Sequence, residues 1–255
     1  MKHYKKYLIP SVGALLLVLI WHITTKLEVL PQYILPTLTD TIKYIYDYSN
    51  VILNNTLITF SEALLGMIFS VLIGYILAVL LHAFPLLRVA FYPHILWLRA
   101  LPVIAIAPLI TLYLGNDISG KVFIAFFISF FSVVVSSLRG LDSVPDELLA
   151  YFKLLGATKI DEYIHLRIPF SVPYLFVGAK IAASIAVIGA LVGEFVGSNK
   201  GLGYLIIVAS HRLEAPAMVA CIIISGGLTL FLYGCISIME FFATKRGYRG
   251  ETNLL

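Results

Sequence analysis

The chain has 255 residues, of which 60% are apolar and only 13% are charged, and its mean hydropathy is +0.96. Soluble domains carry about 25% charged residues, so this chain cannot cover a globular surface with polar groups, and lipid must be its main solvent. The net charge of +4 is too small to indicate nucleic-acid binding. The composition therefore predicts a polytopic, all-α membrane protein.

The first apolar run begins directly after Lys2, Lys5 and Lys6, in the manner of a secretory signal peptide. No small-x-small cleavage site follows it, so we expect an uncleaved first span. A helix crosses a bilayer with about 20 mostly apolar residues. Six windows qualify, and we expect about six transmembrane helices in one domain over residues 1–255: Tyr7–Thr25, Leu57–Ala83, Val89–Leu114, Val122–Leu138, Tyr174–Phe195 and Pro216–Ala243.

Between the first two windows, a mixed stretch around Asp40–Tyr48 predicts a helix at the membrane interface. Cys221 and Cys235 are 14 positions apart in one apolar stretch, or roughly 21 Å along a helix. They cannot form a disulfide within that helix. We expect two apolar packing residues, and no metal spacing or catalytic pair is apparent.

Basic residues predict the orientation, because Lys and Arg are enriched in cytoplasmic loops. With the N-terminus inside, the inner segments hold eleven basic residues: Lys2, Lys5, Lys6, Arg88, Arg139, Lys153, Lys159, Arg167, Lys245, Arg246 and Arg249. The outer segments hold five: Lys26, Lys43, Lys121, Lys200 and Arg212. The bias places both termini in the cytoplasm of a multi-pass protein of the cell membrane.

The connection Arg139–Pro173 is long, polar and on the predicted cytoplasmic side. It reads as two short helices. The first has Pro145 near its start and stops at Gly156, which suits a left-handed cap. The second opens with Thr158 and Asp161 at capping-box spacing and ends before Ile168-Pro169. Such a helical pair can transmit a push as a rigid body, which suits a loop where a soluble motor docks.

In this loop Gly156 is followed by nine residues and then by Leu166-Arg167-Ile168-Pro169. The pattern resembles the Glu-Ala-Ala, Gly, Ile-x-Leu-Pro loop of binding-protein-dependent ABC importer permeases. Ala150-Tyr151-Phe152 occupy the Glu-Ala-Ala positions, and Glu147, one helical turn earlier, is a candidate replacement for the family's glutamate. The resemblance implies an ATPase-docking loop over residues 139–173, with contacts from Glu147, Ala150, Tyr151, Phe152, Gly156, Ala157, Leu166, Ile168 and Pro169.

Other segments resemble the same family over residues 56 to about 243: Thr56-Leu57, Leu98-Arg99-Ala100-Leu101-Pro102 with Ala105 and Pro108-Leu109, Gly193-Glu194, and Gly201-Leu202-Gly203. Their order is similar to that in the nitrate/sulfonate/taurine branch, which includes permeases for pyrimidine precursors of thiamine. The resemblance implies a type I ABC importer permease fold. It also implies a second permease copy in a homodimer, two cytoplasmic ATPase subunits that bind the ATP, an extracytoplasmic solute-binding protein, and no enzyme activity or cofactor of the permease itself.

Four residues are candidates for the transport path: Arg99, Pro102, Pro108 and Glu194. Arg99 is an intramembrane cation and is either pore-lining, structurally paired or snorkelling. Pro102 and Pro108 break a helix that lines the path or only kink it. Glu194, with Glu62, is solvated near an outer interface or forms part of a gate. Lys180 is expected to snorkel from its span.

The alternative functions are a secondary transporter or channel without an ATPase, and an intramembrane enzyme. The first needs coupling-ion groups within the membrane, and the second needs a metal or nucleophile arrangement; neither pattern is evident. The solute stays open among nitrate, bicarbonate, alkyl sulfonates, taurine and pyrimidine-type compounds. The positive charge of Arg99 slightly favours an anionic solute.

Overall fold

The structure is a computed structural model that describes the backbone of residues 2–245 and the side chains of residues 11–244. Every regular element in this part of the chain is a helix. In chain order they are α1 (Lys2–Lys26), α2 (Leu38–Asp47), α3 (Ser49–Ala83), α4 (Pro85–Arg99), α5 (Val103–Leu114), α6 (Ile118–Asp142), α7 (Asp146–Leu154), α8 (Lys159–Glu162), the π turn η1 (Tyr163–Arg167), α9 (Ile168–Phe195), α10 (Leu202–His211) and α11 (Ala215–Lys245). Arg246 and Arg249, counted above among the inner basic residues, lie outside the described residues.

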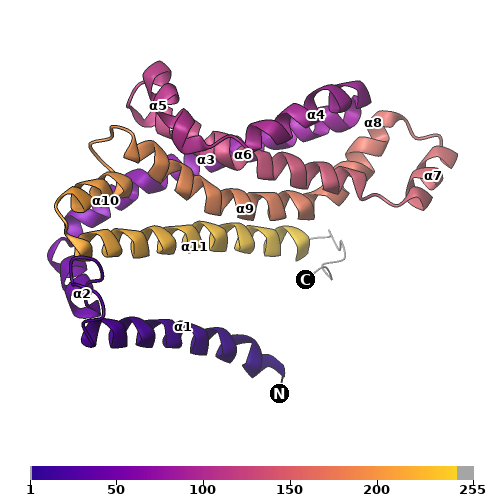
Figure 1. Cartoon of the computed structure of the whole chain (residues 1–255). Coiled ribbons are helices and arrows are strands. Elements are labelled where there is room, and N and C mark those ends of the chain that lie inside the picture. The colour runs from indigo at the N-terminus through magenta and orange to yellow at the C-terminus, as the bar shows by residue number, and fades with distance from the viewer. Residues whose placement is uncertain (1, 246–255) are drawn as a thin grey trace.

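Helices α3, α6, α9 and α11 form the central bundle (Figure 1). Its core is built mainly from small side chains: five alanines of α9, from Ala179 to Ala190, are buried together with Ala63 and Ala125. A Cβ added at Gly189 would lie 2.6 Å from the Ala125 Cα. Lipid offers no hydrophobic drive for helices to associate, so close backbone approach at small residues and van der Waals packing hold such bundles together.

Four helices are long and apolar enough to cross a membrane, namely α3, α6, α11 and the continuous segment Lys159–Phe195. Helices α4 and α5 together qualify as a fifth span, although they are bent by 101°. The apolar part of α1, Ser11–Lys26, is shorter. The helical content and its spans agree with the all-α polytopic fold expected from the sequence.

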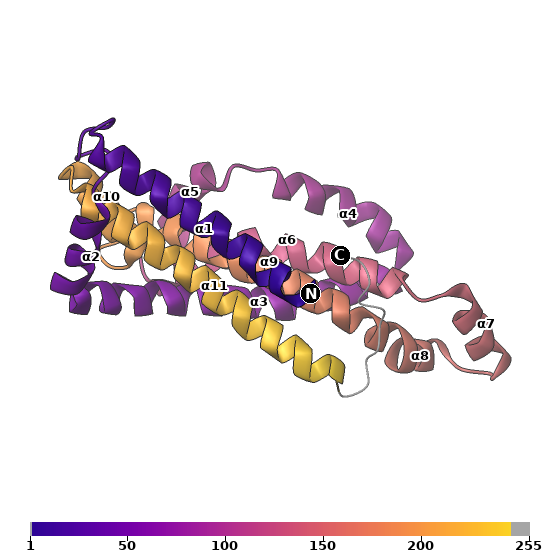
Figure 2. The ribbon, with the colours of Figure 1, turned by 90° about the horizontal axis from the view of Figure 1, so that it is seen from below.

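The window Val89–Leu114 contains a broken helix, which is one of the two readings that its prolines left open. Helix α4 ends at Arg99 and α5 begins at Val103, with Pro102 as its N-cap. Proline disfavours the helical conformation at the residue before it and has no N–H for the preceding turn. The helix therefore stops at Arg99, before Pro102, and the chain turns. Figure 2 shows α4 and α5 as an arm along one side of the bundle.

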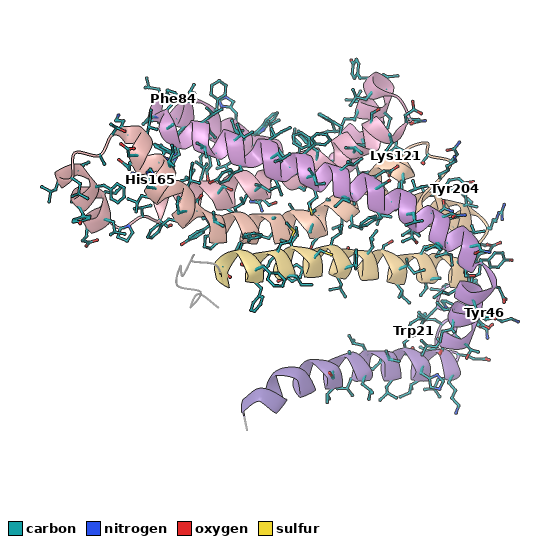
Figure 3. All side chains as sticks on the ribbon, turned by 180° about the vertical axis from the view of Figure 1, so that it is seen from behind. Trp21, Tyr46, Phe84, Lys121, His165 and Tyr204 are labelled. Atoms are coloured by element: carbon teal, nitrogen blue, oxygen red, sulfur yellow. The ribbon has the colours of Figure 1, made fainter. Side chains whose placement is uncertain are left out.

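Helix α1 stands apart from the bundle and reaches it through α2 (Figures 1 and 3). The Trp21 indole N–H donates a hydrogen bond of 2.9 Å to the Pro36 carbonyl and fixes the end of α1 against the linker. Helix α2 begins at the N-cap Thr37, whose hydroxyl accepts from the Asp40 N–H. It packs against α11 and α3, at the bundle end opposite α7 and α8.

Candidate functional site

Helices α7 and α8 project beyond the bundle, at the end where α1 begins and α11 ends (Figure 1). We call residues 143–167 the docking segment. Helix α7 starts after Pro145 with Asp146 and Glu147 in its first turn, where negative charge is favoured. It ends in a Schellman arrangement: the Gly156 N–H bonds the Lys153 carbonyl, and the Ala157 N–H bonds the Phe152 carbonyl, each at 3.1 Å.

Gly156 has φ +73°, a left-handed conformation that favours glycine. Two residues later, α8 begins with a capping box. The Asp161 N–H donates to the Thr158 hydroxyl at 3.2 Å, and the Asp161 carboxylate accepts from the Thr158 N–H at 2.9 Å. The turn between α7 and α8 is therefore closed by hydrogen bonds on both sides, which gives the docking segment a defined shape.

We predicted that the second short helix ends before Ile168-Pro169, and this prediction is wrong. It passes through the π turn η1 directly into α9, and the Ile168 N–H bonds the Tyr163 carbonyl five residues back. Pro169 is the second residue of α9 and follows the π turn directly. The wider π turn supplies the extra residue that lets the chain continue. A single helical path therefore joins the docking segment to α9.

The predicted docking residues differ in exposure. Those on the surface are Glu147, Ala150, Tyr151 and Gly156; Phe152, Ala157, Ile168 and Pro169 are half-buried, and Leu166 is buried. Three large apolar residues that the sequence did not single out are more exposed: Leu154 at 86%, Ile160 at 70% and Leu155 at 65%. The sequence already contained a signal for them, because they are large apolar residues in an otherwise polar loop. Exposed apolar groups gathered in this way mark an interaction surface.

The pore candidates lie on both sides of the bend. Arg99 ends α4 and is exposed, Pro102 caps α5, and Pro108 is exposed inside α5. Broken helices with free ends in the membrane expose backbone groups that can line a path. The structure brings Arg99 and Pro102 together at the bend. Glu194 lies at the end of α9, and its hydrogen-bond partners are in α3 and α10 and not in the α4–α5 arm.

Glu194 and Glu62 are not solvated at an interface, contrary to one reading of the sequence. Each is 1% exposed. Lys121, counted above in an outer segment, is buried in α6, and its ammonium lies 3.3 Å from the Glu62 carboxylate. Figure 3 places Lys121 toward the end of the bundle that also holds Tyr204 of α10. The partners are far apart in sequence, so no local pattern could have revealed them.

Glu194 also holds the start of α10. Its carboxylate accepts hydrogen bonds from the Thr59 hydroxyl at 2.6 Å and from the Gly203 N–H at 2.5 Å. The Leu202 N–H bonds the Thr59 hydroxyl at 2.9 Å. A carboxylate at a helix N-terminus receives free N–H groups and a favourable dipole. A Cβ at Gly201 would collide with the Glu194 carboxylate, which explains why glycine is needed there.

Lys180 does not snorkel freely. Its ammonium pairs with the Glu240 carboxylate of α11 and lies 5.7 Å from the centre of the Tyr233 ring. The pair joins α9 to α11.

The chain is similar to membrane components of transport systems. Residues 70–242 match the family of binding-protein-dependent transport system inner membrane components. A probable ABC transporter permease protein of Haemophilus influenzae is 32% identical over 222 residues, which cover 87% of this chain and 90% of the relative. The formylaminopyrimidine transport permease protein ThiX of Halalkalibacterium halodurans is 31% identical over 247 residues, covering 96% and 95%.

Among solved structures, the chain is similar to one from an inward-facing form of the MetNI methionine ABC transporter, with a TM-score of 0.67. The match covers 76% of this chain and 96% of the other, at 16% identity. This likeness concerns the fold, and it agrees with the bundle described above.

Proposed function

The chain belongs to the family of binding-protein-dependent transport system inner membrane components, as the permease of an ATP-driven importer, and we propose that its docking segment is the surface on which the partner ATPase sits. The observation that carries the proposal is the exposed apolar group Leu154, Leu155 and Ile160 on a helical pair of fixed shape. Burying these side chains against a soluble partner removes apolar area from water. The capped turn at Gly156 and Thr158 keeps the pair rigid enough to transmit a push.

The proposal includes the orientation. The docking segment, the start of α1 and the end of α11 lie at one end of the molecule (Figure 1). The excess of basic residues on these segments supports a cytoplasmic location for that end. Both termini are therefore cytoplasmic. The Glu194 cluster, which consists of Glu194, Thr59 and the start of α10, faces outward.

The proposal also includes the partners. Two permease copies form a homodimer around the path, two ATPase subunits dock beneath them, and an extracytoplasmic solute-binding protein delivers the solute to the outer end. The exposed arm α4–α5, with its break at Arg99 and Pro102, contributes to the path. The ATP is bound by the ATPase, so the permease itself carries no cofactor.

For the solute we propose a pyrimidine precursor of the formylaminopyrimidine type. The formylaminopyrimidine permease is similar to this chain over nearly the whole length of both proteins. A small anion such as nitrate or a sulfonate is the second candidate, favoured by the single exposed cation Arg99 at the bend.

The docking proposal is tested by co-purification. The tagged permease is expressed with its ATPase in a membrane, extracted in mild detergent, and the bound ATPase is quantified. Leu154→Asp with Ile160→Asp should strongly reduce the bound ATPase, because the charges oppose burial of this surface. The matched control is Leu213→Asp, at an apolar residue that is 69% exposed in the connection between α10 and α11. Equal recovery of the ATPase with the unchanged permease, the Leu154→Asp/Ile160→Asp variant and the Leu213→Asp control would contradict the proposal.

The solute is tested separately on the solute-binding protein, by thermal melting with formylaminopyrimidine, nitrate, taurine and an alkyl sulfonate. A melting shift with formylaminopyrimidine alone supports the first candidate, and a shift with an anion alone supports the second.

A further inference from the structure

A polar network closes the base of the docking segment. Arg167, in η1, donates from Nη1 to the Leu141 carbonyl at 2.9 Å and from Nε to the Glu162 carboxylate at 2.5 Å. Leu141 lies in the last turn of α6, where carbonyl groups have no partner within the helix. The last residue of the docking segment therefore caps the helix that precedes the segment, and the two ends of the segment are held together.

The same network includes the end of α3. The Arg167 Nη1 lies 3.1 Å from the His82 Nε2, and the His82 Nδ1 lies 2.5 Å from the Tyr163 hydroxyl. Arginine can only donate, so Nε2 accepts and the ring proton sits on Nδ1, which donates to the Tyr163 oxygen. His82 therefore contacts η1 twice and joins α3 to the docking segment.

Asp142 extends the network to α4. Arg88 donates two hydrogen bonds to its carboxylate, of 2.9 Å and 2.7 Å, in the paired geometry that arginine and carboxylate favour. The Asp142 carboxylate also lies 3.4 Å from the His82 Nε2, but this nitrogen accepts from Arg167 and has no proton to donate to the carboxylate. Asp142 is the last residue of α6, where a negative charge opposes the helix dipole. An aspartate at this position does not stabilise α6, so its pairing with Arg88 is the better explanation for it.

Apolar contacts also attach the arm α4–α5 to the bundle. Ile95 of α4 is buried, and Tyr92 and Leu98 of α4 are half-buried, in a cluster with residues of α3 and α6. The Arg88–Asp142 pair is the polar connection between the start of the arm and the helix that leads into the docking segment. Beyond Arg99 the arm turns through 101° into α5.

We propose that Arg88, Asp142, His82 and Arg167 form a coupling joint, through which a movement of the docking segment is passed to the α4 arm. This proposal rests on ATPase docking at the docking segment, as argued above. The four are positioning residues, which act on the arm without touching the solute. A partly exposed ion pair contributes little to stability, so breaking Arg88–Asp142 should leave a folded permease with a bound ATPase.

The test follows two sites on the assembled transporter. Cys221 and Cys235 are replaced by Ala, and a single spin label is placed at His165→Cys on η1 or at Leu96→Cys on α4, both exposed. In the homodimer each label reports the distance between its two copies. Distances are measured for the complex with its ATPase, at rest and trapped with ATP and vanadate. The movement is driven by the ATPase with ATP and vanadate, so the experiment requires no solute.

In the otherwise unchanged chain, both the 165–165 and the 96–96 distances should shift on trapping. With Asp142→Ala or Arg88→Ala the 165–165 shift should persist, and the 96–96 shift should be at least halved. The exchange Arg88→Asp with Asp142→Arg should restore it. The control is Glu240→Gln, which breaks the Lys180 pair on α9 and α11 and should leave both shifts in place.

A full 96–96 shift in Asp142→Ala would overturn the joint while leaving ATPase docking intact. A failure of the charge exchange to restore the shift would also overturn it. If the 165–165 distance does not respond to ATP in the unchanged chain, ATPase docking itself is contradicted, and the joint with it.

Discussion

Thr59 donates a hydrogen bond of 2.6 Å to Glu194, a residue 135 positions later in the chain. Both side chains are buried, and the Thr59 oxygen also accepts the Leu202 N–H. One hydroxyl therefore connects α3, the end of α9 and the start of α10. In a membrane interior, where water cannot replace a lost partner, such a contact fixes helix positions.

Removing the Glu194 carboxylate should loosen α10. Glu194→Ala leaves the buried Gly203 N–H without its acceptor, at about 1–3 kcal/mol for a buried group left unpaired. The Thr59 hydroxyl loses its shorter hydrogen bond and keeps only the Asn55 carbonyl at 3.2 Å. Glu194→Gln keeps one carbonyl acceptor and should be milder. Thermal unfolding in detergent measures the difference. Equal melting temperatures for Glu194→Ala and the unchanged chain would show that the cluster does not hold α10.

The Lys121–Glu62 pair gives a second prediction. Lys121→Met leaves the buried Glu62 carboxylate without its cation and should destabilise the fold by about 3–5 kcal/mol, as expected when one partner of a buried pair is removed. Adding Glu62→Gln removes that charge and should recover much of the loss. A double variant that is no more stable than Lys121→Met would contradict the pairing. The measurement is again thermal unfolding.

The reach of sequence reasoning differs between local and distant features. The stop at Gly156 and the capping box of Thr158 and Asp161 were predicted, because the residues that make them are neighbours. A break or a kink was predicted at Pro102 from its missing N–H, but the 101° bend could not be predicted because it depends on how α4 and α5 pack. Continuation through η1 was missed because a π turn has no clear sequence signal. The burial of Glu62 and Glu194 depends on Lys121 and α10, contacts that a single sequence does not contain.

Arg99 provides a test of the transport path. Arg99→Ala should reduce uptake while the amount of permease in the membrane stays normal, because the side chain is exposed at the bend and supports no core packing. Arg99→Lys should be milder if charge alone matters, and equally harmful if two-point binding by the guanidinium is required. Uptake in membrane vesicles of matched permease content decides between them. Normal uptake by Arg99→Ala would exclude Arg99 from the path.

Gly156 tests the shape of the docking segment. A residue with a Cβ at φ +73° should cost about 1–2 kcal/mol locally. No neighbour lies within 4 Å of an added Cβ, so the effect comes from the backbone and not from a clash. Gly156→Val should therefore leave the helices inserted while reducing bound ATPase and uptake, measured on the same preparation. Gly156→Asn is the matched variant, since asparagine tolerates this conformation better, and it should be milder. Val and Asn variants that both bind ATPase normally would contradict the need for a fixed turn.

The most direct test of the central claim is a cross-link between the docking segment and the ATPase. In a background without Cys221 and Cys235, a cysteine is introduced at Ala157 or Lys159, and a second one in the ATPase surface that faces the membrane. Disulfide formation is followed in native membranes, with and without ATP. We predict a cross-link from both positions, with a yield that changes when ATP is added. Labelling of either cysteine by an impermeant reagent from outside the cell, with no cross-link to the ATPase, would contradict both the orientation and the docking function.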